Sequence, residues 1–171
     1  MLLLFLDIAT ETDWASASLG AAAVGAYVRE RGHAAALLRI PPDQPLEAAA
    51  RAVLAQAPDC IGLSLACRQW PRVKALAAVL RELSAVPVLA GGLLPTFASA
   101  EILAAPGIDY ACIGQGEEPA ARLLDALARG ERPAAGIPGL ATREEPVPAR
   151  LPDLDPSALP FWARDLCGES N

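Results

Sequence analysis

The sequence is poor in the residues that most often build disulfide frameworks and metal sites. It has one histidine, one methionine and 5% aromatic residues among its 171 positions. Its four cysteines show no C-x-x-C spacing, so we expect no disulfide framework and no metal ligand set. Cys60 and Cys112 lie in apolar, strand-like runs and are predicted to be buried thiols.

Long apolar runs are also missing. The apolar stretch at the N-terminus, residues 1–6, ends at Asp7 and lacks the basic segment of a signal peptide. No stretch approaches the roughly 20 apolar residues of a membrane span. We therefore expect a cytoplasmic protein without a membrane partner.

Positive charge is scarce relative to negative charge. Lysine and arginine number 14 against 20 acidic residues, for a net charge of −6. Proteins that bind nucleic acids need a basic face for the phosphates, so no nucleic-acid partner is expected. Hydrophobic residues make up 53% of the chain, which is enough for one domain with a packed core.

Apolar runs alternate with amphipathic segments along the first three quarters of the chain. Such an alternation implies βαβ crossovers and a parallel sheet covered on both faces. We predict a doubly wound α/β fold of Rossmann or flavodoxin type, with a mostly parallel five-stranded sheet. The expected strands are residues 2–6, 34–40, 59–64, 86–90 and 110–113, and the expected helices are 19–31, 45–56, 71–83, 97–104 and 118–129.

Small residues follow three of the predicted strands. Ser64 ends the third strand, Gly91 and Gly92 follow the fourth, and Gly114-Gln115-Gly116-Glu117 follows the fifth. The carboxyl ends of parallel strands share one edge of the sheet, where ligands of doubly wound folds bind. The pattern is no dinucleotide fingerprint, because that motif belongs after the first strand.

The last quarter of the chain has a different composition. Seven prolines fall between residues 133 and 171. We predict a domain over residues 1–132 and a proline-rich linker or edge segment over 133–171, in which residues 137–142 are compatible with a short edge strand. The bulky residues 159–162 are expected either to pack back on the domain or to approach a following domain.

Six blocks along the chain, in this order, resemble the N-terminal cobalamin-binding domain of B12-dependent radical SAM proteins. In that family the last two blocks link the cobalamin domain to the radical SAM barrel. The blocks cover nearly the whole chain: Pro87–Gly92, Pro95-Thr96, Ile108–Tyr110, Gly114–Glu117, Ile137–Leu140 and Asp153–Pro160.

The resemblance implies cobalamin as the cofactor. It implies that Ser64 hydrogen-bonds the nucleotide tail, that Gly91 and Gly92 leave room for it, and that residues 114–117 flank the tail or the corrin edge. The loop after the first strand, residues 8–14, would border the lower face of the corrin. The implied cofactor-binding residues are Ala9, Thr10, Ser64, Leu65, Gly91, Gly92, Gly114, Gln115, Gly116 and Glu117.

Two departures from the family pattern refine this expectation. Other B12 domains carry Asp-x-His-x-x-Gly after the first strand, with the histidine on cobalt, whereas here Ala9 takes the histidine position after Asp7. The only histidine, His33, follows the first helix at the far edge of the sheet and is interpreted as a helix C-terminal cation. The resemblance then implies base-off cobalamin without a histidine ligand. Trp14 or Leu65 would then lie against the lower face of the corrin in place of a histidine.

The second departure is the lack of the C-x-x-x-C-x-x-C motif that holds a [4Fe–4S] cluster. The cluster and S-adenosylmethionine are therefore expected only in a radical SAM domain, fused in cis or acting in trans. No catalytic residue is expected in this chain, which would be a piece of a longer enzyme or a stand-alone carrier.

Three functions stay open at this point. The first is the cobalamin-binding module of a methyltransferase-like radical SAM enzyme. The second is a degenerate B12 domain with a structural or interaction role, in which Trp70, Leu93, Leu94 and Phe97 fill the groove. The third, a hydrolase or nucleotide enzyme, has the least support, since neither a Ser-His-Asp set nor a phosphate loop is present.

Overall fold

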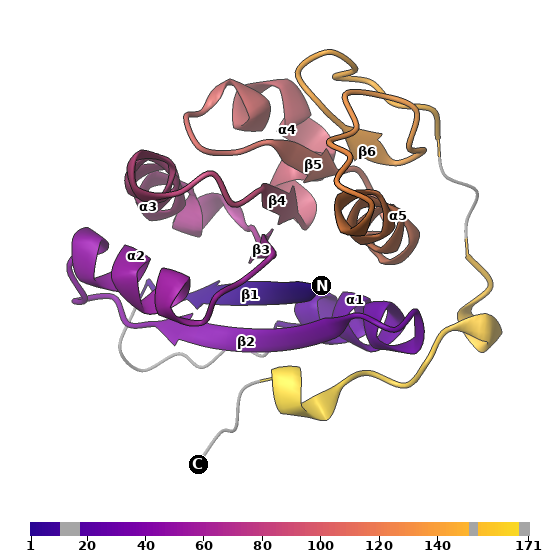
Figure 1. Ribbon diagram of the computed structural model, residues 1–171, viewed down its shortest axis with the longest axis horizontal. Coiled ribbons are helices and arrows are strands. Elements are labelled where there is room, and N and C mark those ends of the chain that lie inside the picture. The colour runs from indigo at the N-terminus through magenta and orange to yellow at the C-terminus, as the bar shows by residue number, and fades with distance from the viewer. Residues whose placement is uncertain (11–17, 151–153, 168–171) are drawn as a thin grey trace.

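The protein is described by a computed structural model that covers residues 1–10, 18–150 and 154–167 (Figure 1). Strands and helices alternate as the sequence predicts. The strands are β1 (Leu2–Ile8), β2 (Ala34–Ile40), β3 (Cys60–Ser64), β4 (Val88–Gly91), β5 (Tyr110–Cys112) and β6 (Leu140–Ala141). The helices are α1 (Leu19–Glu30), α2 (Leu46–Ala55), α3 (Trp70–Leu83), α4 (Leu93–Ala104) and α5 (Glu117–Ala128).

The strands form one sheet in the order β2-β1-β3-β4-β5-β6. The first five are parallel and β6 is antiparallel to β5, so the sheet has six strands rather than the predicted five. The sixth lies inside the segment that was compatible with an edge strand. The chain runs from β1 outward to β2 and then back across β1 to β3, which makes a topological switch point between β1 and β3. This confirms the predicted doubly wound fold.

Helices cover both faces of the sheet, with α1 and α5 on one face and α2, α3 and α4 on the other (Figure 1). Successive residues of β1 point to opposite faces: Leu3 and Phe5 lie in the α1/α5 core, and Leu4 and Leu6 in the other core. Burial on both sides explains why the strands read as continuous apolar runs. Each fully buried leucine stabilises the fold by roughly 2 kcal/mol.

The fourth helix begins earlier than its sequence indicates. We predicted residues 97–104, whereas α4 begins at Leu93 and has a kink at Ala98, with φ −138° and ψ 39°. Pro95 lies in the first turn, where a proline does not remove an intrahelical hydrogen bond. The extra turn places Leu93 and Thr96 at the carboxyl edge of the sheet.

Side chains of α1 and α5 join the two helices directly. The Tyr27 hydroxyl donates to Glu118 Oε2 at 2.5 Å, and Arg31 Nη2 donates to the same oxygen at 2.9 Å. The Arg31 guanidinium lies 5.0 Å from the centroid of the Tyr27 ring. The hydrogen bond from Tyr27 is the largest cause of the lowered pKa of the Glu118 carboxyl. This cluster fixes the separation of α1 and α5.

The segment after β6 returns to α1 (Figure 1). Leu166 is buried against Gly25, and Asp165 forms two hydrogen bonds with Arg29 at 2.9 and 2.7 Å. Phe161 nevertheless stays fully exposed, and Trp162 is 56% exposed. The end of the segment thus packs back on the domain, while Phe161 and Trp162 face outward.

None of the helices within the described residues is long and apolar enough to cross a bilayer. The expected buried thiols are found, since Cys60 and Cys112 are both buried and free.

Gly107→Ala should lower the free energy of unfolding by at least about 3 kcal/mol. Gly107 has φ +86°, and a Cβ there would lie 2.1 Å from the carbonyl oxygen of Ala77 in α3. Gly130→Ala is the matched control, because Gly130 has φ +77° but no atom within 4 Å of an added Cβ. The control should cost only the backbone strain, about 1–2 kcal/mol. Urea titration of both variants measures the difference, and equal losses would contradict the close approach of Gly107 to α3.

Candidate functional site

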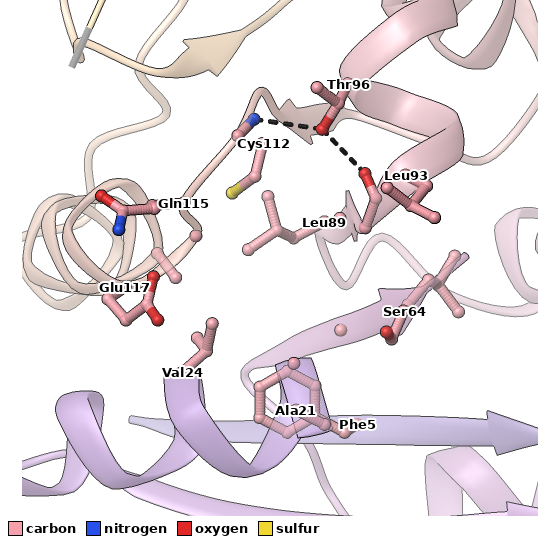
Figure 2. Close-up of a pocket in the computed structure, with 18 of the residues that line it drawn as sticks. Phe5, Ala21, Val24, Ser64, Leu89, Leu93, Thr96, Cys112, Gln115 and Glu117 are labelled. Carbon is pink, nitrogen blue, oxygen red and sulfur yellow. Dashed lines mark hydrogen bonds between the residues drawn. The ribbon is translucent and has the colours of Figure 1, made fainter. Parts of the chain in front are cut away.

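A cavity of about 480 Å³ opens on the α1/α5 face of the sheet (Figure 2). It is walled by α1, α4 and α5, and its floor is formed by β3, β4 and β5. Residues far apart in the sequence contribute to this cavity, because the carboxyl ends of parallel strands meet at one edge of the sheet. The lining residues include Phe5, Gly20, Ala21, Val24, Gly62, Ser64, Leu89, Gly91, Gly92, Leu93, Thr96, Phe97, Cys112, Gly114, Gln115, Gly116 and Glu117.

Small residues keep the floor of the cavity low. Ser64 pairs in register with Gly91, so this row carries little side-chain volume. In the row of Gly62 and Leu89, the Phe5 ring covers the glycine, since a Cβ at Gly62 would lie 2.7 Å from Phe5 Cδ1. A Cβ at Gly91 would make only ordinary contacts, 3.8 Å from Cys112 Cβ and 3.9 Å from Leu63 O. Backbone conformation therefore does not require glycine at position 91. The missing side chain there contributes open space.

Gly92 has a different reason for being glycine. Its φ is +98°, and an added Cβ would lie 2.8 Å from the carbonyl oxygen of Leu65. The Leu65 amide donates to Gly91 O at 2.8 Å, which holds this backbone in place. Gly92 thus lets the chain turn tightly from β4 into α4.

Thr96 connects the two glycine-rich loops at the cavity mouth. Its hydroxyl donates to the carbonyl oxygen of Gly92 at 2.8 Å and accepts from the Gly114 amide at 3.1 Å (Figure 2). Gln115, in the second loop, accepts the Leu154 amide on its side-chain oxygen at 3.0 Å. The loops are therefore held to α4 on one side and to the C-terminal segment on the other.

Gly116 and Glu117 shape the wall where α5 begins. A Cβ at Gly116 would lie 3.2 Å from Val24 Cγ2, so glycine lets α5 approach α1 closely. The Glu117 carboxylate points toward the cavity (Figure 2). Its Oε2 atom is buried and has no hydrogen-bond partner among the described residues.

The Cys112 side chain adds a neutral, apolar wall to the cavity. Burial raises the pKa of its thiol to about 12, and the nearby Glu117 charge adds to that rise. A thiol with such a pKa stays protonated at neutral pH and is a poor nucleophile.

Seven of the ten residues implied by the resemblance line this cavity: Ser64, Gly91, Gly92, Gly114, Gln115, Gly116 and Glu117. The other three do not. Ala9 is buried and its amide donates to Ile40 O at 3.0 Å, Thr10 is exposed, and Leu65 packs in the core on the opposite face. Trp14 and the rest of residues 11–17 lie outside the described part of the chain.

The end of β1 carries a charged pair next to Ala9. Asp7 lies 3.6 Å from Arg39 of β2, its partner in the strand register. Burial raises the pKa of Asp7 by more than the positive charge of Arg39 lowers it. The Asp7 side chain is only 14% exposed and pairs with Arg39 at the edge of the sheet.

The bulky residues considered as groove fillers do not occupy the cavity. Leu93 and Phe97 are 70% and 84% exposed at its rim, whereas Trp70 and Leu94 pack against the core on the other face. The space between α1 and α5 is therefore open.

Sequence reasoning missed the contributions of α1 and β1 to the cavity. Phe5, Ala21 and Val24 line it, as do Cys112 and Thr96. The period-2 pattern of the strands could have placed Phe5 and Cys112 on one face, but it does not show which helix covers that face.

His33 lies far from this site. It follows α1 at the edge where the parallel strands begin, whereas the cavity lies at their carboxyl ends. Its Nε2 is 3.0 Å from Asp125 Oδ1 of α5, and its side chain is 8% exposed. Among the described residues, no three His, Cys, Asp or Glu side chains come together as a metal site.

Two solved structures share this fold over most of the chain. The radical S-adenosylmethionine methyltransferase TsrM from Kitasatospora setae, with cobalamin and a [4Fe-4S] cluster bound, has a TM-score of 0.75 and 18% identity over 93% of this chain. The cobalamin-dependent S-adenosylmethionine radical enzyme OxsB, with aqua-cobalamin and S-adenosylmethionine bound, has a TM-score of 0.78 and 15% identity over 96%. These likenesses cover only 30% and 24% of the two longer proteins.

A comparison with curated protein sequences finds no match. A family model, described as the B12 binding domain, matches residues 8–124, which run from the last residue of β1 through β2 to β5 and most of α5. The sequence resemblance, the doubly wound fold and this match agree, and the chain belongs to the B12-binding domain family.

Proposed function

We propose that this chain binds cobalamin, with the nucleotide tail in the cavity between α1 and α5 and the corrin over its mouth. The observation that carries the proposal is the open cavity of about 480 Å³ at the carboxyl edge of a B12-family sheet. A cofactor-sized pocket at this edge is where doubly wound folds bind ligands.

The residues present fit such a cofactor. The cavity is lined mostly by apolar residues, and Gly91 leaves a space that a side chain would fill. Ser64 provides a hydroxyl on the floor, and the buried Glu117 Oε2 is an acceptor without a donor. The residues that would hold the nucleotide tail are Ser64, Gly91, Gly92, Gly114, Gln115, Gly116 and Glu117.

The rim of the cavity suits a flat apolar ring. Leu93 and Phe97 are exposed there, next to the backbone of the loops that carry Gly92 and Gly114. A corrin is largely apolar, with amide groups at its periphery. Apolar side chains beside accessible main-chain groups can meet both parts of that surface.

We further propose that cobalamin is held base-off and without a protein histidine. Ala9, at the position of the family histidine, has no ligating atom, and His33 lies at the opposite edge of the sheet beside Asp125. Neither residue can reach a cofactor at the cavity mouth.

The proposed biological role is that of a cobalamin module for a radical SAM enzyme. The resemblance in sequence and the fold shared with TsrM and OxsB support this role. Bound cobalamin would supply methyl transfer, while the cluster and S-adenosylmethionine would belong to a radical SAM domain in cis or in trans. This chain's own residues would bind and orient the cofactor and exclude water from its tail.

The degenerate, structural alternative has less support. It requires bulky side chains in the groove, whereas the candidates Trp70 and Leu94 pack elsewhere and Phe97 stays at the rim.

Gly91→Leu should weaken cobalamin binding at least tenfold, about 1.4 kcal/mol, because the new side chain fills the cavity. A Cβ is tolerated at this position, so the variant should fold. Ala104→Leu is the matched control, since it adds the same side chain at the exposed end of α4. Titration of absorbance with hydroxocobalamin gives both dissociation constants. Unchanged binding by Gly91→Leu would place the cofactor elsewhere.

The bound cofactor should show a base-off absorption spectrum, and His33→Ala should leave that spectrum unchanged. The reason is the distance of His33 from the cavity and the absence of a ligating atom at Ala9. A base-on spectrum of the complex, or a spectrum that changes in His33→Ala, would contradict the proposed binding mode.

A further inference from the structure

The cavity contains a carboxylate oxygen that lacks a hydrogen-bond donor. Glu117 is the first residue of α5, and its Oε2 is buried without a partner among the described residues. A buried carboxylate oxygen without a donor costs free energy, and native proteins pair almost all buried polar atoms. The unpaired oxygen therefore marks a place where a donor from outside the chain would fit.

The arginines near the start of α5 do not meet this need. Arg31 and Arg122 contact the neighbouring Glu118, at 2.9 and 2.8 Å, rather than Glu117. Glu118 also receives the Tyr27 hydroxyl. Two adjacent carboxylates thus have opposite environments. Glu118 is saturated with donors between the helices, and Glu117 faces the cavity with one oxygen unpaired (Figure 2).

No other side chain of the cavity, the Ser64 hydroxyl included, donates to Glu117 Oε2 among the described residues. Phe5, Ala21, Val24 and Leu89 are apolar, and the Cys112 thiol is a weak donor. A ligand group that enters between them and carries only apolar edges would leave the carboxylate buried and unpaired. Such a ligand would bind less well than one that brings an O–H or N–H group to this position.

We infer that Glu117 is a specificity-determining residue that accepts a hydrogen bond from the nucleotide tail of the cofactor. This inference rests on the proposed cobalamin function. In the proposed binding mode the corrin lies over the cavity mouth, so the tail is the part that can reach the carboxylate.

Two groups of the tail have the required chemistry. A ribose hydroxyl is present whatever the base. An exocyclic amine is present when the base is adenine but absent from dimethylbenzimidazole, which has no N–H donor in its neutral, cobalt-free form. The two sources can be separated with corrinoids that differ in the tail alone.

The test measures dissociation constants of three corrinoids by absorbance titration. They are cobalamin, its analogue with adenine as the lower base, and cobinamide, which lacks the nucleotide. Glu117→Leu should weaken binding of at least one nucleotide-bearing corrinoid by roughly 10- to 100-fold, the range for a hydrogen bond to a charged group. Cobinamide should bind wild type and variant equally.

Glu117→Gln provides a second variant with nearly the same shape. It keeps a carbonyl acceptor but loses the charge, so its loss of affinity should be smaller than that of Glu117→Leu. Glu101→Gln, on the exposed surface of α4, is the matched control and should bind all three corrinoids like wild type. Melting temperatures of the cofactor-free variants establish that they are folded.

The pattern of losses identifies the donor. Equal losses for both nucleotide-bearing corrinoids would assign the ribose hydroxyl, and a loss confined to the adenine analogue would assign the exocyclic amine. Either result supports the inference. Unchanged affinity for both nucleotide-bearing corrinoids in folded Glu117→Leu would overturn it, as would an equal loss for cobinamide. If wild type bound none of the three, the proposed function itself would fail.

Discussion

The contact between α1 and α5 is the interaction on which the rest of the site depends. Tyr27 and Arg31 bind Glu118, Gly116 brings α5 against Val24, and His33 lies beside Asp125. All of these contacts involve the middle and the C-terminal end of α1. The N-terminal end of α1, with Gly20 and Ala21, is left apart from α5, and the cavity occupies that space.

The floor of the cavity imposes a second condition. A sheet covered by helices normally fills the space beneath them with side chains, because close packing and apolar burial stabilise the fold. Here Ser64 and Gly91 leave that space open on the α1/α5 face, whereas the Phe5 ring covers Gly62. On the other face, Leu63, Leu65 and their neighbours are fully packed against α2, α3 and α4. The protein thus leaves apolar burial unused at the carboxyl ends of β3 and β4 on the α1/α5 face, as expected for a binding site in a B12-family domain.

Much of this fold could be predicted from the sequence. The boundaries of the strand at residues 34–40 are as expected, and those of the other predicted strands differ by only a few residues. The agreement is close because burial on both faces gives each strand a continuous apolar run.

The start of α4 could not be predicted, since a proline near the beginning of a helix is equally typical of a turn. The two-residue strand β6 depends on pairing with β5 and has almost no signal of its own. Leu65 illustrates the same limit in the site, because it directly follows the cavity residue Ser64 in the chain but packs in the opposite core.

The sequence by itself determined the order of the elements and the small residues at the strand ends, because both follow from local patterns of apolar residues and glycine. It also determined that Ala9, two residues after Asp7, takes the position of the family histidine. Only the tertiary structure decided which of these residues share one cavity and which helices form its walls. It also separated Glu117 from Glu118, adjacent in sequence but different in environment. The physical reason is that burial and pairing depend on residues distant in the chain, here those of α1, which the local pattern around α5 does not contain.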